Sequence, residues 1–133
     1  MNAINEVYEF LKNCGVYYLA TMEGNQPRVR PFGTVDLFEN RIYIQTGRIK
    51  KVADQLKDNP KVEISGMHKG KWIRITAKAV LDNSIEAQTH MLDTYPSLQD
   101  RYQPGDGNNE VYYLKNATAQ ICSFAEDPVT LTF

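Results

Sequence analysis

The sequence lacks several features that would place it in well-known functional classes. No apolar run approaches the roughly 20 residues that cross a membrane, and Met1 does not open a signal peptide, so we expect a cytoplasmic protein with no membrane partner. Neither sign of charge dominates, since 15 Lys and Arg residues stand against 16 Asp and Glu residues. Without a basic surplus or an acidic tail, neither a nucleic acid nor a strongly charged protein is an expected partner.

Residues for metal, redox or nucleophilic chemistry are also scarce. The two cysteines, Cys14 and Cys122, are far apart and form no CxxC pair, so two buried thiols are expected rather than a disulfide. The two histidines, His68 and His90, have no metal-ligand spacing to a cysteine or a carboxylate cluster, so no metal site is predicted. The GxGxxG, P-loop, GxSxG and HExxH patterns are absent. Any chemistry is therefore expected to belong to a bound cofactor.

Short strand-like segments make up most of what is present. Helices are predicted at Asn2–Cys14, directly after Gly47, and at Ser84–Tyr95. Strands are predicted at Val16–Met22, Pro27–Phe38, Arg41–Thr46, Lys61–His68, Lys71–Leu81, Glu110–Leu114 and Ala117–Phe124, followed by a short tail. Pro31 and Gly33 interrupt the second of these strands, which predicts a bulge or a ligand close to the backbone. Because most strands are joined by short turns, we expect one mainly β domain over residues 1–133. Its fold would be an antiparallel sheet of six to seven strands, closed or nearly closed into a barrel.

The segment from Thr46 to Pro60 carries the strongest local signal of function. A strand ends at Thr46 and Gly47, and the apolar residues Ile49, Val52, Ala53 and Leu56 then follow a helical period. Three cations, Arg48, Lys50 and Lys51, fall in the first turns of this predicted helix. A helix N-terminus offers unpaired N–H groups and the positive end of the dipole, so the added cations and a threonine hydroxyl predict a seat for a phosphate group.

The order of these residues resembles a known family. The pattern Arg-x-Arg-Pro, Thr-Gly, Lys-Lys, Gln-Leu-x-x-Asn-Pro and Trp-x-Arg-x-x-x-Lys-Ala is similar to that of the pyridoxamine 5′-phosphate oxidase-like family of FMN-binding split barrels. The resemblance covers Val16 to Leu81 and returns in general form in the last strands. It implies a homodimer that binds one FMN per subunit in clefts between the subunits.

The resemblance also implies roles for individual residues. It places a contact to the flavin or its phosphate arm at Arg30, and the flavin ring along the backbone of Pro31 to Gly33. It places the ring edge and the phosphate at Gln45 and Thr46, at the end of the third strand. It also implies that the basic residue Lys51 contacts the phosphate. Lys50 lies in the same turn and can compensate for a missing family cation, and Trp72 matches a flavin contact. The implied cofactor-binding residues are Arg30, Pro31, Phe32, Gly33, Gln45, Thr46, Lys50, Lys51 and Trp72; no catalytic residue is assigned.

The chain also departs from the family pattern. The family oxidase often has basic residues where this chain has Val35 and Val52. The true oxidase ends in a basic substrate signature with Arg and His, whereas this sequence ends in AEDPVTLTF. Oxidation of pyridoxamine phosphate is therefore not expected.

Ordinary structural explanations compete with several of these assignments. The lysine pair can form a solvated helix face, and Trp72 can pack in a core or a subunit interface. For Arg28 and Arg30, the alternative to a shared anionic ligand is two charges on one exposed strand face. For Arg74, the alternative is a surface salt bridge, and His68 can be a polar residue at a strand end.

Three functions are consistent with the sequence. The first is an FMN-dependent oxidoreductase that acts on a small molecule, with an electron donor such as NAD(P)H. The second is a non-catalytic module that binds or stores FMN. The third is a haem-handling relative on the same barrel, with His68 or His90 as the axial ligand.

Overall fold

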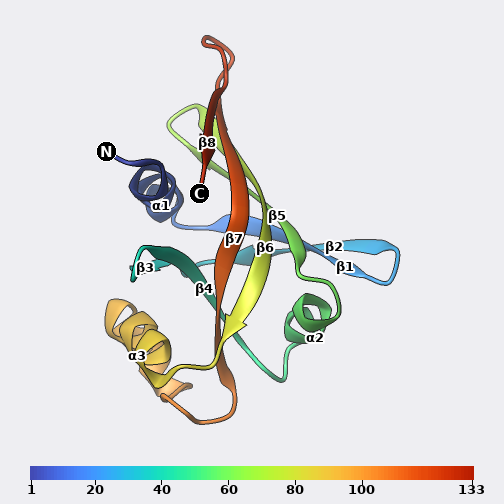
Figure 1. Cartoon of the computed structure of the whole chain (residues 1–133), viewed down its shortest axis with the longest axis vertical. Helices are drawn as coiled ribbons and strands as arrows, with labels where there is room; N and C mark the ends of the chain where they lie inside the picture. Colours follow the sequence, from blue (N-terminus) through green and yellow to red (C-terminus); the bar gives the residue numbers. More distant parts are fainter.

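The computed structural model describes all 133 residues as one twisted antiparallel sheet with three α-helices around it (Figure 1). The neighbouring strands follow the order β2-β1-β5-β6-β7-β4-β3, and β8 pairs with β7. The strands are β1 (Tyr17–Glu23), β2 (Gln26–Phe32), β3 (Asp36–Phe38), β4 (Arg41–Gly47), β5 (Lys61–His68), β6 (Lys71–Asp82), β7 (Asn109–Cys122) and β8 (Val129–Thr132). The predicted mainly β, antiparallel fold class is confirmed, with eight strands in place of six or seven.

The alternation of side chains along the strands builds the core. In β5 and β6, every second residue is buried, and Ile64, Ile73 and Ile75 are fully enclosed. These residues join a cluster of 21 buried residues that also contains side chains of the first two helices. Because successive side chains in a strand point to opposite faces, the other face of β5 and β6 is left to solvent.

The three α-helices are α1 (Ala3–Cys14), α2 (Lys51–Asp58) and α3 (Ile85–Thr94). Asn2 caps α1 by accepting a hydrogen bond from the amide of Asn5, and Ser84 caps α3 in the same way from Ala87. A short 3₁₀ helix, η1 (Pro96–Asp100), follows α3. No helix is long and apolar enough to cross a membrane.

Two predicted strands at the C-terminal end of the chain differ from the structure. The two predicted closing strands form a single strand, β7, whose kink is accommodated by Asn116 with φ of 52°. The register between β6 and β7 shifts near this point, between Thr76 and Lys78. The predicted tail forms β8, which pairs with β7 from Thr118 to Ile121.

The second strand predicted for Pro27–Phe38 is interrupted near Gly33, as expected, but the interruption is a complete break at residues 33–35 that divides the segment into β2 and β3. Side chains satisfy the backbone of the break in place of a neighbouring strand. The Tyr95 hydroxyl accepts from the amide of Val35 and donates to its carbonyl, both at 3.0 Å. The Tyr17 hydroxyl donates to the carbonyl of Thr34 at 2.5 Å. The break therefore has a fixed conformation at the edge of the barrel.

Candidate functional site

A cavity of about 200 Å³ lies where the end of β2, the break after it, the end of β4 and the start of α2 meet. Its walls hold most of the predicted cofactor-binding residues although these are separated in the sequence. The lining residues are Arg30, Pro31, Phe32, Gly33, Thr34, Gln45, Thr46, Lys50 and Val52. Lys51 and Trp72 are not among them. The structure thus brings one arginine, one lysine and a buried threonine hydroxyl to the same opening.

Arg30 is fixed in this cavity by three hydrogen-bond acceptors. Its guanidinium donates to Gln55 Oε1 at 2.6 Å, to Thr21 Oγ1 at 2.7 Å and to the Leu19 carbonyl at 3.2 Å. Burial, with a smaller contribution from the charge of Arg28, lowers the pKa of the Arg30 guanidinium, which stays charged at neutral pH. None of these acceptors is a carboxylate, so the positive charge is positioned without being neutralised.

Thr21 and Gln55 are supporting residues that the sequence reading missed. Both are buried, and the Thr21 hydroxyl donates to Gln55 Oε1 at 2.5 Å. The sequence does contain a signal for Gln55: a glutamine on the inward face of a helix is buried and therefore has to find hydrogen-bond partners. Gln55 stands one position before the apolar Leu56, so the prediction from the apolar stripe alone passed over it.

The start of α2 differs from the prediction, which placed the helix directly after Gly47. Lys50 is the extended N-cap residue, and the helix begins at Lys51. Ile49 is 81% exposed, so it is not part of the buried stripe as predicted. The reason is a contact from a distant loop: the carbonyl of Asn108 accepts from the Arg48 amide at 2.7 Å, and Asn108 Oδ1 accepts from the Ile49 amide at 3.3 Å. The turn of residues 47–50 is therefore held outside the helix.

Asp106 organises the loop that makes these contacts. Its carboxylate accepts from the backbone amides of Gln103, Asn108 and Asn109 at 2.6–2.9 Å. Burial alone would raise the pKa of Asp106, but these N–H donors hold it below its usual value. Arg48 adds a side-chain bond to the Gly107 carbonyl at 2.8 Å. Asp106 therefore positions the segment that leads into Lys50.

Gly47 fits this segment because it has no side chain. A Cβ at this position would lie 2.9 Å from the Tyr102 hydroxyl and 3.3 Å from Asn108 Oδ1. Two residues earlier, the side-chain amide of Gln45 donates to Asn109 Oδ1 at 3.0 Å, and the backbone amide of Gln45 donates to the Thr34 hydroxyl at 3.2 Å. The cavity wall on the β4 side is thus connected both to the loop and to the strand break.

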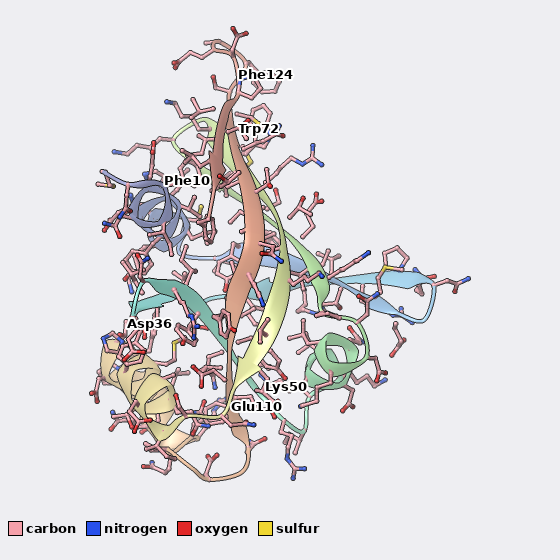
Figure 2. The ribbon with its side chains drawn as sticks, in the orientation of Figure 1. Phe10, Asp36, Lys50, Trp72, Glu110 and Phe124 are labelled. Carbon is pink, nitrogen blue, oxygen red and sulfur yellow. The ribbon has the colours of Figure 1, made fainter.

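The two predicted residues outside the cavity lie in different places. Lys51 is the exposed first residue of α2, close enough to Glu23 for its charge to help lower the pKa of that carboxyl, after the larger effect of Arg28. Trp72 lies at the opposite end of the molecule from Lys50, where its ring contacts Phe124 with 5.1 Å between centroids (Figure 2). Within one chain, Trp72 cannot share a ligand with Arg30.

Other charged residues noted in the sequence have partners of their own. Arg28 pairs with Glu23 at 2.9 Å, and Arg74 pairs with Glu63 at 3.2 Å, both on the surface. His90 Nδ1 lies 2.6 Å from Asp36 Oδ2, and the His68 ring lies edge-on to the ring of Phe10. Neither histidine lines the cavity beside Arg30, and no three His, Cys, Asp or Glu residues cluster to hold a metal ion.

The two positions at which the family oxidase often has a basic residue are occupied by valines of the core in this protein. Val35 and Val52 are buried at 2% and 5% exposure, so no charge is missing from the surface at these points. Cys14 and Cys122 are free and partly buried, so the predicted burial is only partial. Burial raises the pKa of the Cys14 thiol.

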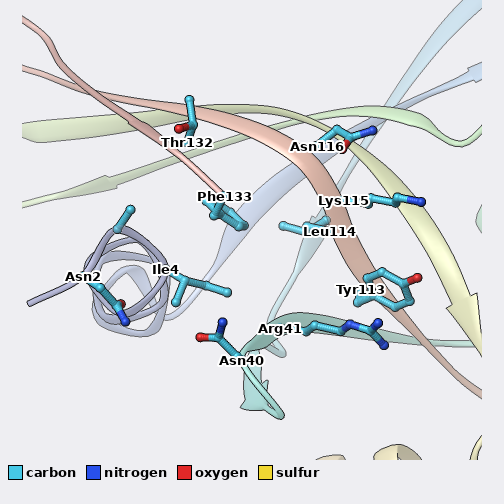
Figure 3. Close-up of a pocket in the computed structure, with 11 residues that line it drawn as sticks. Asn2, Ile4, Asn40, Arg41, Tyr113, Leu114, Lys115, Asn116, Thr132 and Phe133 are labelled. Atoms are coloured by element: carbon cyan, nitrogen blue, oxygen red, sulfur yellow. The ribbon is translucent and has the colours of Figure 1, made fainter.

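A larger cavity, of about 530 Å³, lies elsewhere, between the start of α1, the β3–β4 turn, the middle of β7 and the end of β8 (Figure 3). The Arg41 guanidinium lies 4.1 Å above the Tyr113 ring at its rim. None of the predicted cofactor-binding residues lines it. Size alone therefore does not identify the site, because the convergent cations and the strand break belong to the smaller cavity.

An antiparallel sheet wrapped into a barrel, with a cationic cavity at a strand break beside a short helix, defines the class of this protein as a split barrel. The sequence matches the pyridoxamine 5′-phosphate oxidase family over residues 4–121. The chain belongs to this family, as its residue pattern indicated.

Solved structures agree with this assignment. A NimC/NimA family protein from Clostridium acetobutylicum is 44% identical, with a TM-score of 0.95 over 98% of this chain and 92% of that one. A FAD-binding protein from Mesorhizobium loti is 17% identical (TM-score 0.60, 90% and 94% covered), and a heme-binding protein from Mycobacterium smegmatis is 14% identical (TM-score 0.73, 99% and 58% covered). At such identities the last two share the fold alone. No match was found among curated proteins.

Proposed function

We propose that this protein is a flavoprotein that binds FMN between the two subunits of a homodimer and acts as an oxidoreductase on a small molecule. The observation that carries the proposal is the convergence of Arg30, Thr46 and Lys50 on one cavity at the N-terminus of α2. Two cations, of which Arg30 is fixed by its hydrogen bonds, together with a hydroxyl and unpaired helix amides, are the donors that a phosphate monoester needs.

The residues fit the two ends of FMN in different ways. The phosphate would be held by Lys50, Thr46 and the first amides of α2, with Lys51 adding charge from the adjacent surface. The flavin ring would lie along Pro31 to Gly33, where a Cβ built on Gly33 would meet nothing within 4 Å. Gly33 therefore leaves the backbone open to a flat ligand. When bound, FMN supplies hydride or electron transfer, and the chain supplies position and electrostatics.

The volume of the cavity supports a site shared by two chains. Cofactor sites commonly enclose about 300–1,000 Å³, whereas this cavity measures about 200 Å³. One chain can thus hold the phosphate and part of the ring, and a second surface has to cover the rest. A two-fold dimer would supply that surface twice, once for each site.

A non-catalytic FMN-binding or storage module is the second candidate, and one observation favours it. The cavity is lined by no carboxylate, histidine or cysteine, so the chain places no ordinary acid or base beside the ring. NAD(P)H oxidation by the FMN-loaded protein, with turnover on an acceptor, separates the oxidoreductase from the module. The haem alternative has no support from the cavity, because neither His68 nor His90 lines it.

The test of the proposed function is a titration of the purified protein with FMN and with riboflavin, followed by flavin fluorescence. FMN should bind more tightly by about tenfold or more, because a charge-assisted hydrogen bond contributes roughly 1.5–3 kcal/mol. Equal affinity for the two flavins would contradict the phosphate seat.

A further inference from the structure

The cavity of about 530 Å³ in Figure 3 lies at a gap in the strand pairing along one edge of β7. On this edge, β4 pairs with β7 as far as Tyr113, and β8 pairs with it from Thr118 onward. Residues 114–116 therefore have no strand partner there, although β6 still pairs with β7 on the other edge. Asn116, with φ of 52°, turns β7 at this point. The pairing of the strands thus sets the cavity, and its volume is within the range of about 300–1,000 Å³ that ligand sites commonly enclose.

One end of this cavity is apolar. Ile4 and Leu114 are 8% and 4% exposed and belong to the main core cluster, against which Phe133 is also packed. Two backbone hydrogen bonds with Ala117, at 2.8 and 3.0 Å, hold Phe133 in place. In Figure 3, Leu114 and Phe133 lie on the side of the cavity toward Ile4. An apolar group placed here would be removed from water without any change in the core.

The other end of the cavity is cationic. Arg41 at the start of β4 and Lys115 of β7 lie at the same end in Figure 3, with Tyr113 beside them. Neither Arg41 nor Lys115 forms an ion pair with a carboxylate of the chain. No aspartate or glutamate lines the cavity. The lining therefore carries positive charge that the chain itself does not neutralise.

The guanidinium of Arg41 has a defined orientation although the side chain is exposed. It lies 4.1 Å from the centre of the Tyr113 ring, a cation–π contact. The Tyr43 hydroxyl, and to a lesser extent the charge of Asp82, raise the pKa of Arg41 further above neutrality. Asp82 itself accepts from the Tyr43 hydroxyl at 2.7 Å and from the Ser84 amide at 2.9 Å. Arg41 thus stays charged and keeps N–H donors for a planar acceptor.

We propose that this cavity is a second ligand site, which binds a small organic carboxylate with an apolar body. The carboxylate would accept from Arg41, with Lys115 adding positive charge, and the apolar body would lie against Ile4 and Leu114. The flat fork of a guanidinium matches the two oxygens of a carboxylate. An inorganic anion would leave the apolar end unused, and a cation would meet two positive charges.

The site is separate from the cavity beside Arg30. No residue lines both cavities. The inference therefore does not rest on the proposed function, and it stands or falls whether or not the protein binds a flavin.

Isothermal titration calorimetry of the purified protein with 2-naphthoate tests the proposal. The comparison ligand is 2-naphthamide, which has the same ring system without the charge. One molecule of 2-naphthoate should bind per chain, about tenfold or more tightly than 2-naphthamide, because only the acid forms a charge-assisted bond to Arg41. Benzoate should bind more weakly than 2-naphthoate, since it buries less apolar surface.

Variants of Arg41 connect the binding to this cavity. Arg41→Gln should lower the affinity for 2-naphthoate to that for 2-naphthamide and leave the affinity for 2-naphthamide unchanged, which also shows that the cavity is still folded. Arg41→Lys keeps the charge without the fork, so it should lose part of the affinity for the acid and none for the amide. The matched control is Arg101→Gln, which removes another exposed arginine without an ion pair and should change neither affinity.

Four results would overturn the site. They are no binding of 2-naphthoate at millimolar concentration, equal affinity for the acid and the amide, equal losses in Arg41→Gln and Arg101→Gln, and unchanged affinity for the acid in Arg41→Gln. In the last case, displacement of 2-naphthoate by FMN would place the ligand in the cavity beside Arg30 instead. Binding of 2-naphthoate that depends on Arg41 and persists in the presence of FMN supports the second site.

Discussion

The two ends of the sheet are built in opposite ways. At the cavity, Arg30 is held by three acceptors, and its polar neighbours are buried and paired. At the turn between β7 and β8, Phe124 is almost entirely exposed and has one aromatic neighbour, Trp72. The polar end has its hydrogen bonds satisfied within the chain, whereas the apolar end leaves a large aromatic side chain in water. The contrast shows that, of these two ends, only the cavity end has a fixed arrangement of polar groups that could bind a charged ligand.

The largest effect that separates the two ends is expected for Arg30→Ala. The variant removes a cation from the cavity, leaves the buried Thr21 hydroxyl without its donor, and leaves Gln55 Oε1 with the Thr21 hydroxyl as its one remaining donor. We expect FMN affinity to fall by more than about tenfold and the free energy of unfolding to fall by about 1–3 kcal/mol. Flavin titration and urea unfolding measure the two changes.

Arg28→Ala is the matched control, since it lies on the same strand but pairs with Glu23 at the surface. Its effect on the free energy of unfolding should stay below about 1 kcal/mol, and FMN affinity should change little. Equal losses in the two arginine variants would mean that the cavity end depends on general surface charge and not on a fixed donor.

The lysine pair comes next in expected effect. The double Lys50→Ala, Lys51→Ala variant should bind FMN at least about tenfold more weakly while its affinity for riboflavin and its unfolding midpoint stay the same. The selectivity for FMN is the informative quantity, because both lysines are exposed and contribute little to folding. Lys115→Ala, an exposed lysine on β7, controls for the loss of charge. An equal loss of affinity for FMN and riboflavin would show that the lysine pair does not bind the phosphate group.

The smallest effect is expected at Asp106, which supports the cavity from the loop. Because the folded pKa of this carboxyl is lowered, its contribution to stability is present above the unfolded pKa of about 3.9 and is lost as the pH falls through the folded pKa. Asp106→Ala should lower the free energy of unfolding at pH 7 by less than about 1 kcal/mol, since the residue is exposed.

Below pH 4, the difference between Asp106→Ala and the unchanged protein should shrink, as urea unfolding at several pH values would show. A difference that grows toward low pH would contradict the assigned sign. Weaker FMN binding by the variant at pH 7 would show that the loop also positions the phosphate end.

The parts of the fold that the sequence predicted are those controlled by local patterns. The strand Lys71–Leu81 and the helix that begins near Ser84 depend on patterns among neighbours in the chain, so they could be recognised directly. In contrast, β8 is a short and largely exposed segment that becomes a strand only by pairing with β7. Pro31 and Gly33 indicated an interruption of the second strand, but the hydrogen bonds that satisfy the break come from Tyr95, a residue distant in the sequence.

The candidate site divides in the same way. The residue pattern indicated Arg30, Thr46 and Lys50, and all three line the cavity, although their binding roles stay predictions. Gln55 and Asp106 were missed because their importance comes from partners that only folding brings near. The start of α2 was misplaced for the same reason, since Asn108, which is distant in the sequence, accepts hydrogen bonds from the amides of Arg48 and Ile49 in the turn before the helix.

The Tyr95 hydroxyl, which bonds both backbone groups of Val35, has a consequence for the motions of the molecule. Tyr95 follows α3 directly and also accepts a hydrogen bond from Lys12 of α1 at 3.0 Å, so one phenol connects two helices to the segment that lines the cavity. The Val35 amide can exchange its hydrogen with solvent only when this connection opens. Deuterium uptake at this single amide therefore reports how often the wall of the cavity loosens, whether or not a ligand is present.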